Sequence, residues 1–117
     1  MSKKTAELPS RYREAQARFP GVLSSYENFG KAIERAGTLS RREQRLVKLG
    51  LAFGARMEGA AHAAVRKALE AGLAPAEIEH AALLAMSTLG FPNGMMFLSW
   101  VEDVVESKRG KRKGARR

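Results

Sequence analysis

The chain has 117 residues, of which 28% are charged, and its formal net charge is +9. This length fits one domain with a modest core, so that self-association would bury useful additional surface. The chain contains no cysteine, which excludes disulfides, thiolate metal sites and thiol catalysis within it. No apolar run approaches the roughly 18–20 residues needed to span a bilayer, and the N-terminal residues lack the apolar stretch of a secretory signal. We therefore expect a cytoplasmic protein without membrane association.

The positive charge is concentrated at the C-terminal end of the chain. Residues 108–117 hold seven of the 21 basic residues and no acidic residue, and without them the net charge falls from +9 to +2. Two glycines and the lack of large apolar residues predict a disordered basic tail. Such a tail either stays solvated and aids solubility, or binds nucleic acid nonspecifically through phosphate contacts. We expect a flexible N-terminal arm over residues 1–8, a single helical domain over 9–107 and this tail.

The composition predicts an all-α fold of about six helices. Alanine, leucine, glutamate and arginine favour helices, and the strict apolar–polar alternation of strands is absent. Turn residues at 19–21, at Gly37, at Gly72 and at 90–94 separate the periodic segments. Helices are therefore expected over residues 11–18 and 22–36, from Ser40 onward, and over 59–71, 75–89 and 95–107.

The third and fourth of these helices have the clearest patterns. Ser40 and Glu43 fit the S-x-x-E capping box, in which each side chain satisfies a free backbone N–H at the helix start. Helical spacing in the third helix predicts a buried face made of Leu46, Leu49, Phe53 and Met57. In the fourth helix, one small-residue face that would let a neighbouring helix approach closely is made of Ala61, Ala64, Val65 and Ala68.

Three segments over about residues 39–97 carry a family resemblance. They read LSRREQRLVKLGLA, ARMEGAAHAAVRKALEAGLAPAEI and ALLAMSTLGFPNG. In combination they resemble the carboxymuconolactone decarboxylase family, which includes the alkylhydroperoxidase D-like proteins. The resemblance implies an alkylhydroperoxidase D-like helical subunit that assembles into a homo-oligomer, with a hexamer as the expected size.

The functional positions of that family have changed in this chain. Its peroxidase members carry C-x-x-C-x-x-x-H, and the resemblance places the two cysteines at Met57 and Ala60 and the histidine at Ala64. The glutamate of the family's proton relay falls on Arg45. Thiol peroxidase activity is therefore not expected, because the thiolate is the nucleophile. The decarboxylase branch is free of cofactors, but it also relies on a histidine at the Ala64 position.

Glu58 and His62 are the candidate catalytic residues that remain. They lie four residues apart on one expected helix, so their side chains can meet, and a carboxylate can orient a histidine for general acid–base work. The resemblance then implies a cofactor-free enzyme of the lyase type, acting on a small organic acid or lactone. The alternative is an ordinary polar stripe, Glu58–His62–Arg66, on a non-catalytic oligomeric protein that binds a small ligand or serves as a scaffold.

We expect no metal site and no cofactor from the sequence. The chain has two histidines, and His80 lies on a different expected helix from His62, off its apolar face. The pattern E-x-x-x-H by itself lacks the ligands of a closed zinc site. The expected partners are other copies of the chain, a small organic ligand and, through residues 108–117, nucleic acid.

Overall fold

The computed structural model describes the backbone of residues 10–115 and the side chains of residues 10–110. Residues 1–9, which include the expected N-terminal arm, and residues 116–117 of the basic tail lie outside this range. Within the described residues all regular structure is helical, which confirms the all-α fold. No helix in this part of the chain is both long and apolar enough to cross a membrane. The chain divides into two compact units, Met1–Thr38 and Leu39–Arg117.

The first unit contains helices α2 (Ser10–Arg18) and α3 (Pro20–Glu34), which pack against each other. Proline suits the first position of a helix because its fixed backbone angle is already helical, and α3 accordingly begins at Pro20. The Tyr12 hydroxyl donates a hydrogen bond of 2.6 Å to Glu27 Oε2 and so joins the two helices. This bond to a carboxylate is the main reason that the pKa of Tyr12 is raised.

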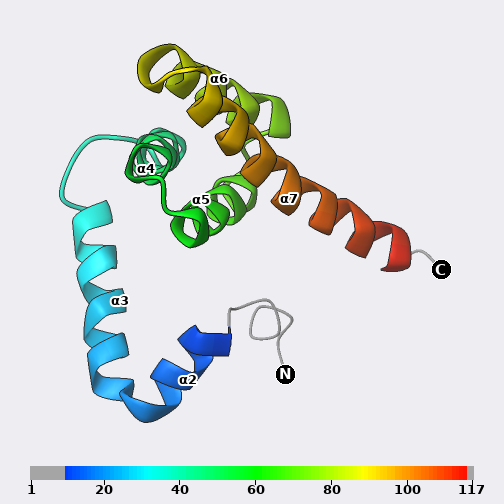
Figure 1. Cartoon of the computed structure of the whole chain (residues 1–117). Helices are drawn as coiled ribbons and strands as arrows, with labels where there is room; N and C mark the ends of the chain where they lie inside the picture. Colours follow the sequence, from blue (N-terminus) through cyan, green and yellow to red (C-terminus); the bar gives the residue numbers. More distant parts are fainter. Residues whose placement is uncertain (1–9, 116–117) are drawn as a thin grey trace. The chain divides into compact units, whose positions relative to one another are not determined.

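The second unit is a bundle of four helices: α4 (Arg41–Ala55), α5 (Glu58–Glu70), α6 (Pro75–Leu89) and α7 (Phe91–Ala115). Helix α4 packs against α5 and α6, and α7 packs against the same two helices (Figure 1). Ser40 and Glu43 form the expected capping box at the start of α4. Arg42 in the first turn of α4 donates to Glu77 Oε2 of α6 at 2.6 Å and ties these two helices together.

The core of the bundle is formed by one face of each helix. Phe53 of α4 stacks on Phe97 of α7 with ring centroids 5.0 Å apart, and Trp100 lies 5.6 Å beyond Phe97. The small-residue face of α5 is confirmed, because three of its four members have no exposed surface: Ala61, Val65 and Ala68. These small side chains leave room for α4 and α7 to approach α5 on both sides.

The expected buried face of α4 is wrong at its two ends. Leu49 and Phe53 are fully buried, but Leu46 is 40% exposed and Met57 is 59% exposed. Met57 lies outside α4 because the helix ends at Ala55, where Arg56 adopts a left-handed conformation with φ of 56°. Met57 instead precedes the first residue of α5, which turns its side chain away from the α4 core face.

The last helix is longer than the sequence pattern indicated, at both ends. Helix α7 begins at Phe91, so most of the expected break at 90–94 forms its first turn, with Pro92 at a position where a missing N–H costs nothing. Its backbone continues to Ala115, which departs from the expectation of disorder from residue 108 onward. Lysine and arginine are good helix formers, and positive charge is favourable near a helix C-terminus, so a helix that is already nucleated extends readily.

Candidate functional site

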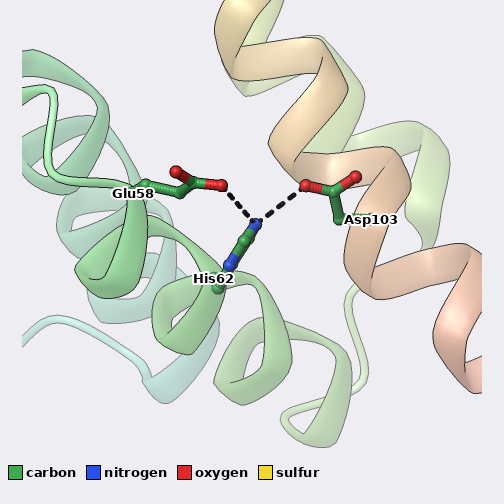
Figure 2. Close-up of side chains that lie close together, drawn as sticks. All are labelled: Glu58, His62 and Asp103. Carbon is green, nitrogen blue, oxygen red and sulfur yellow. Dashed lines mark hydrogen bonds and ion pairs between the residues drawn. The ribbon is translucent and has the colours of Figure 1, made fainter.

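His62 lies between two carboxylates that come from different helices (Figure 2). Its Nε2 atom is 3.0 Å from Asp103 Oδ2 of α7 and 3.8 Å from Glu58 Oε2, one turn earlier on α5. The His62 side chain is 28% exposed, whereas those of Glu58 and Asp103 are 60% and 55% exposed. The structure thus brings together the two residues that the sequence paired and adds a third.

Asp103 was not identifiable from the sequence as part of this cluster. It lies 41 residues after His62, and no local spacing links them. The neighbours of Asp103 on α7 include the buried residues Trp100, Val101 and Val104. These apolar residues hold α7 against α5, and Asp103 projects from the edge of that contact toward His62. Apolar residues around a single carboxylate are a common pattern in helices, so the sequence near Asp103 could not predict its contact with His62.

The Nε2 atom of His62 is the point on which both carboxylates converge. When this nitrogen carries a hydrogen, it donates to Asp103 Oδ2. A lone pair at the same position would face the two carboxylate oxygens across a gap suited to a shared cation. The arrangement can therefore hold a proton, orient the imidazole or contribute three ligands to a metal ion.

A separate pocket of about 360 Å³ lies between α4 and α5. Its lining combines the cationic residues Arg45, Lys48 and Lys67 with the apolar residues Leu51, Ala52, Ala60, Ala63 and Ala64. The family positions described above fall largely here. The positions of the second cysteine, the histidine and the glutamate are occupied by Ala60, Ala64 and Arg45, and all three line the pocket.

Two of the three cations of this basic pocket, Lys48 and Lys67, have no carboxylate partner in an ion pair among the described residues. Lys67 is exposed, but neighbouring protein atoms still remove part of the hydration of its ammonium group. This desolvation lowers the pKa of Lys67, and repulsion from Arg45, Lys48 and Arg66 lowers it further, while Glu70 acts in the opposite direction.

The His62 cluster and the basic pocket lie on different sides of α5. Ala60 and Ala64 are each two residues from His62, which corresponds to about 200° around a helix. His62 contacts α7, whereas the pocket opens between α5 and α4. His62 and Glu58 are therefore not positioned to act on a molecule held by Arg45, Lys48 and Lys67.

A larger groove of about 610 Å³ runs between α4 and α6. Its lining is mostly apolar, with Leu46, Leu84 and Leu89 among its larger side chains, and it includes His80. His80 is exposed and on a different helix from His62, as expected. Leu46 is exposed and does not belong to the core because its side chain borders this open groove.

Comparison with known proteins gives one match. The family model described as the carboxymuconolactone decarboxylase family matches residues 20–103, from the first residue of α3 to Asp103 in α7. No curated protein and no solved structure matches the chain. The family match covers well over half of the 117 residues, agrees with the all-helical structure and includes every residue of both sites. The chain belongs to the carboxymuconolactone decarboxylase family, as a member without cysteine.

Proposed function

We propose that this protein binds a small organic acid in the basic pocket between α4 and α5. One observation carries this proposal. Arg45, Lys48 and Lys67 line one pocket together with Ala60 and Ala64. The resemblance places catalytic side chains of other family members at three of these positions, Arg45, Ala60 and Ala64. A carboxylate ligand would reduce the repulsion that Lys67 experiences from Arg45 and Lys48, and this gain is specific to an anion.

The size and lining of the pocket define the class of ligand. A volume of about 360 Å³ is at the small end for ligand pockets, which favours a compact acid of few carbon atoms. The alanines and Leu51 offer an apolar surface for its carbon skeleton, and arginine can hold a carboxylate with two parallel hydrogen bonds. Among the described residues, the lining offers cationic and apolar side chains but no carboxylate, imidazole or hydroxyl group, which favours the binding of an anion.

The test is a calorimetric titration of the full chain with a panel of short mono- and dicarboxylates. Binding should weaken with added salt, since the interaction is between exposed charges, and the uncharged amides of the same acids should not bind. Lys48→Gln and Lys67→Gln should each weaken binding about tenfold, as expected when a charged hydrogen bond is lost. Lys108→Gln on α7 removes the same charge away from the pocket and should leave binding unchanged. Equal affinity for acids and amides would contradict the proposal.

Acid–base catalysis by His62 is the second candidate function. It is favoured by the contact with Asp103, which, together with Glu58, can fix the ring and leave Nδ1 to exchange a proton with a substrate. The reaction would be of the lyase type and free of cofactors, with a small organic acid or lactone as substrate. Turnover of such compounds should then fall strongly in His62→Ala and less in Glu58→Gln. Turnover that is the same in His62→Ala and wild type would remove His62 from the mechanism.

We also propose that the protein forms a homo-oligomer, with a hexamer as the expected size by family resemblance. The support from the bundle is its many exposed large apolar side chains, such as Val47 and Leu51 of α4 and Leu83 and Leu84 of α6. Such side chains mark contact surfaces when they gather on neighbouring helices.

Nonspecific nucleic-acid binding through residues 108–117, in a cytoplasmic protein, stays a prediction. Its support is the seven basic residues of this segment. Binding to DNA or RNA should fall steeply with added salt and disappear in a variant that ends at Ser107. Binding that survives this truncation would point to the basic residues of the bundle instead.

A further inference from the structure

We propose that Glu58, His62 and Asp103 form a binding site for a divalent transition-metal ion, with zinc as the expected occupant. This site goes beyond the organic-acid pocket, from which it is separated by the width of α5, and it does not depend on that pocket being occupied. The sequence argued against a metal because E-x-x-x-H offers two ligands, and the packing of α7 on α5 supplies a third.

The distances within the cluster are those that a shared ion requires. Zinc binds imidazole nitrogen and carboxylate oxygen at about 2.0–2.2 Å. Two ligand atoms on one ion therefore lie about 3–4 Å apart when the ligand–zinc–ligand angle is about 90° or wider. His62 Nε2 lies 3.0 Å from Asp103 Oδ2 and 3.8 Å from Glu58 Oε2. One ligand atom from each of the three residues lies within 4.8 Å of the others. Small rotations of the two exposed carboxylates would close the remaining gap.

The donor set also suits this class of ion. One imidazole and two carboxylates are typical ligands of zinc, iron and manganese, and the two negative charges balance a divalent cation when His62 is neutral. The α5–α7 contact, with Ala61, Val65 and Val101 fully buried, holds the two ligand-bearing helices in fixed relation. Because Glu58 and Asp103 are more than half exposed, water can complete the coordination sphere.

An ion-pair cluster without metal is the competing explanation, in which a protonated His62 is shared by the two carboxylates. The two explanations differ in what a metal ion does. A metal takes the Nε2 lone pair and displaces the proton, so zinc binding would release protons and weaken as the solution is acidified. A metal-bound His62 could not serve as a general base through this nitrogen.

The test is a calorimetric titration of tag-free, chelator-treated full-length protein with zinc chloride, repeated with cobalt as a spectroscopic probe. We expect one zinc per subunit in the wild type. Binding should be lost in His62→Ala and weakened at least about tenfold in Asp103→Asn and Glu58→Gln, which keep the shape of each side chain but remove its charge. His80→Ala removes the other histidine, on α6, and should bind zinc like the wild type.

Circular dichroism and sedimentation of each variant establish that it folds and assembles like the wild type. The proposal is overturned if zinc fails to bind the wild type, or if His62→Ala binds it as well as His80→Ala does. It is also overturned if Asp103→Asn binds like the wild type, because the third ligand is what distinguishes this site from a pair of side chains on one helix. Titration of the same variants with the organic acids keeps the two sites apart, since His62→Ala should retain acid binding.

Discussion

Gly94 is a residue at which two helices approach each other closely. It is buried in the first turns of α7, and a Cβ atom there would overlap the side chain of Met86 on α6. The close approach at Gly94 could not be predicted from the sequence, where Gly94 belongs to a segment that has the composition of a turn. Glycine is required at this position because only a residue without a side chain lets α6 and α7 come this close. Its backbone conformation is not the reason, since other residues adopt it as well.

Gly94→Ala should lower the free energy of unfolding by about 1–3 kcal/mol, because the added methyl group forces α6 and α7 apart. The measurement is urea denaturation monitored by circular dichroism. Gly50→Ala is the matched control, since Gly50 lies within α4 and a Cβ there meets nothing within 4 Å. That variant should be stabilised by roughly 0.5–1 kcal/mol through helix propensity. Equal effects of the two substitutions would contradict the packing argument.

Lys67 is a second residue whose surroundings, rather than its type, set its behaviour. Desolvation and neighbouring positive charges lower its pKa in the folded protein. A lysine with a lowered folded pKa destabilises the fold while it is charged. This cost is fully present below the folded pKa and disappears as the pH rises through that value toward the ordinary lysine pKa of 10.5.

Lys67→Gln should therefore raise the free energy of unfolding slightly at neutral pH, by no more than about 0.5 kcal/mol for an exposed side chain. The gain should shrink at high salt and as the pH approaches 10.5. Urea denaturation at two pH values and two salt concentrations measures it, with Lys108→Gln as the control. A loss of stability at neutral pH would mean that Lys67 is held by a favourable contact.

At the scale of the element, the starts of α4 and α6 follow their sequences more closely than the end of α4 does. The starts of α4 and α6 are set by local hydrogen bonds, in which Ser40 N–H donates to Glu43 Oε1 and Ala74 N–H donates to Glu77 Oε1. The bond from Ala74 is the main reason that the pKa of Glu77 is lowered, with Arg42 adding to it. The end of α4 at Ala55 depends instead on how α5 enters the bundle, which no local pattern specifies.

Ser40→Ala should lower the free energy of unfolding by about 1 kcal/mol, the usual effect of removing a capping hydroxyl. Its hydroxyl accepts a hydrogen bond of 3.1 Å from Glu43 N–H, and without it this donor loses its side-chain partner. Thermal denaturation of the variant measures the change. Ser25→Ala, within the exposed part of α3, removes a hydroxyl that caps no helix and should leave stability unchanged or slightly higher.

At the scale of the whole molecule, apolar surface is left uncovered by the bundle. The groove between α4 and α6 is bordered by Leu46, Leu84 and Leu89, all exposed by more than a third. Leu83 of α6 and Val47 and Leu51 of α4 are also exposed. Contact between copies of the chain would bury this surface and make up for the modest core.

Sedimentation at micromolar concentration should therefore give a mass several times the 12.8 kDa of one chain. Leu84→Arg places a charge on the exposed apolar surface and should shift the population toward smaller species while the helical content is retained. Glu79→Arg introduces the same side chain elsewhere on α6 and is the control. A wild type that sediments as a monomer would contradict the oligomer, whatever the variants do.

The fold class could be predicted from the sequence because it depends on local properties. Helix-forming composition, the Ser40–Glu43 cap and the spacing of Ala61, Val65 and Ala68 all act within one or two helical turns. The family followed from segments over 39–97, and the absence of cysteine by itself excluded thiol chemistry. The chain's own sequence thus determined the fold class and the family.

The sites depended on the tertiary structure. Asp103 reaches His62 across 41 residues, and Lys48 meets Lys67 only because α4 packs on α5. Sequence spacing resolves neighbours on one helix, but it says nothing about which faces of two helices meet. That choice is made by burial of the apolar residues, above all Phe53, Phe97 and Trp100, and the polar side chains are carried into place by it.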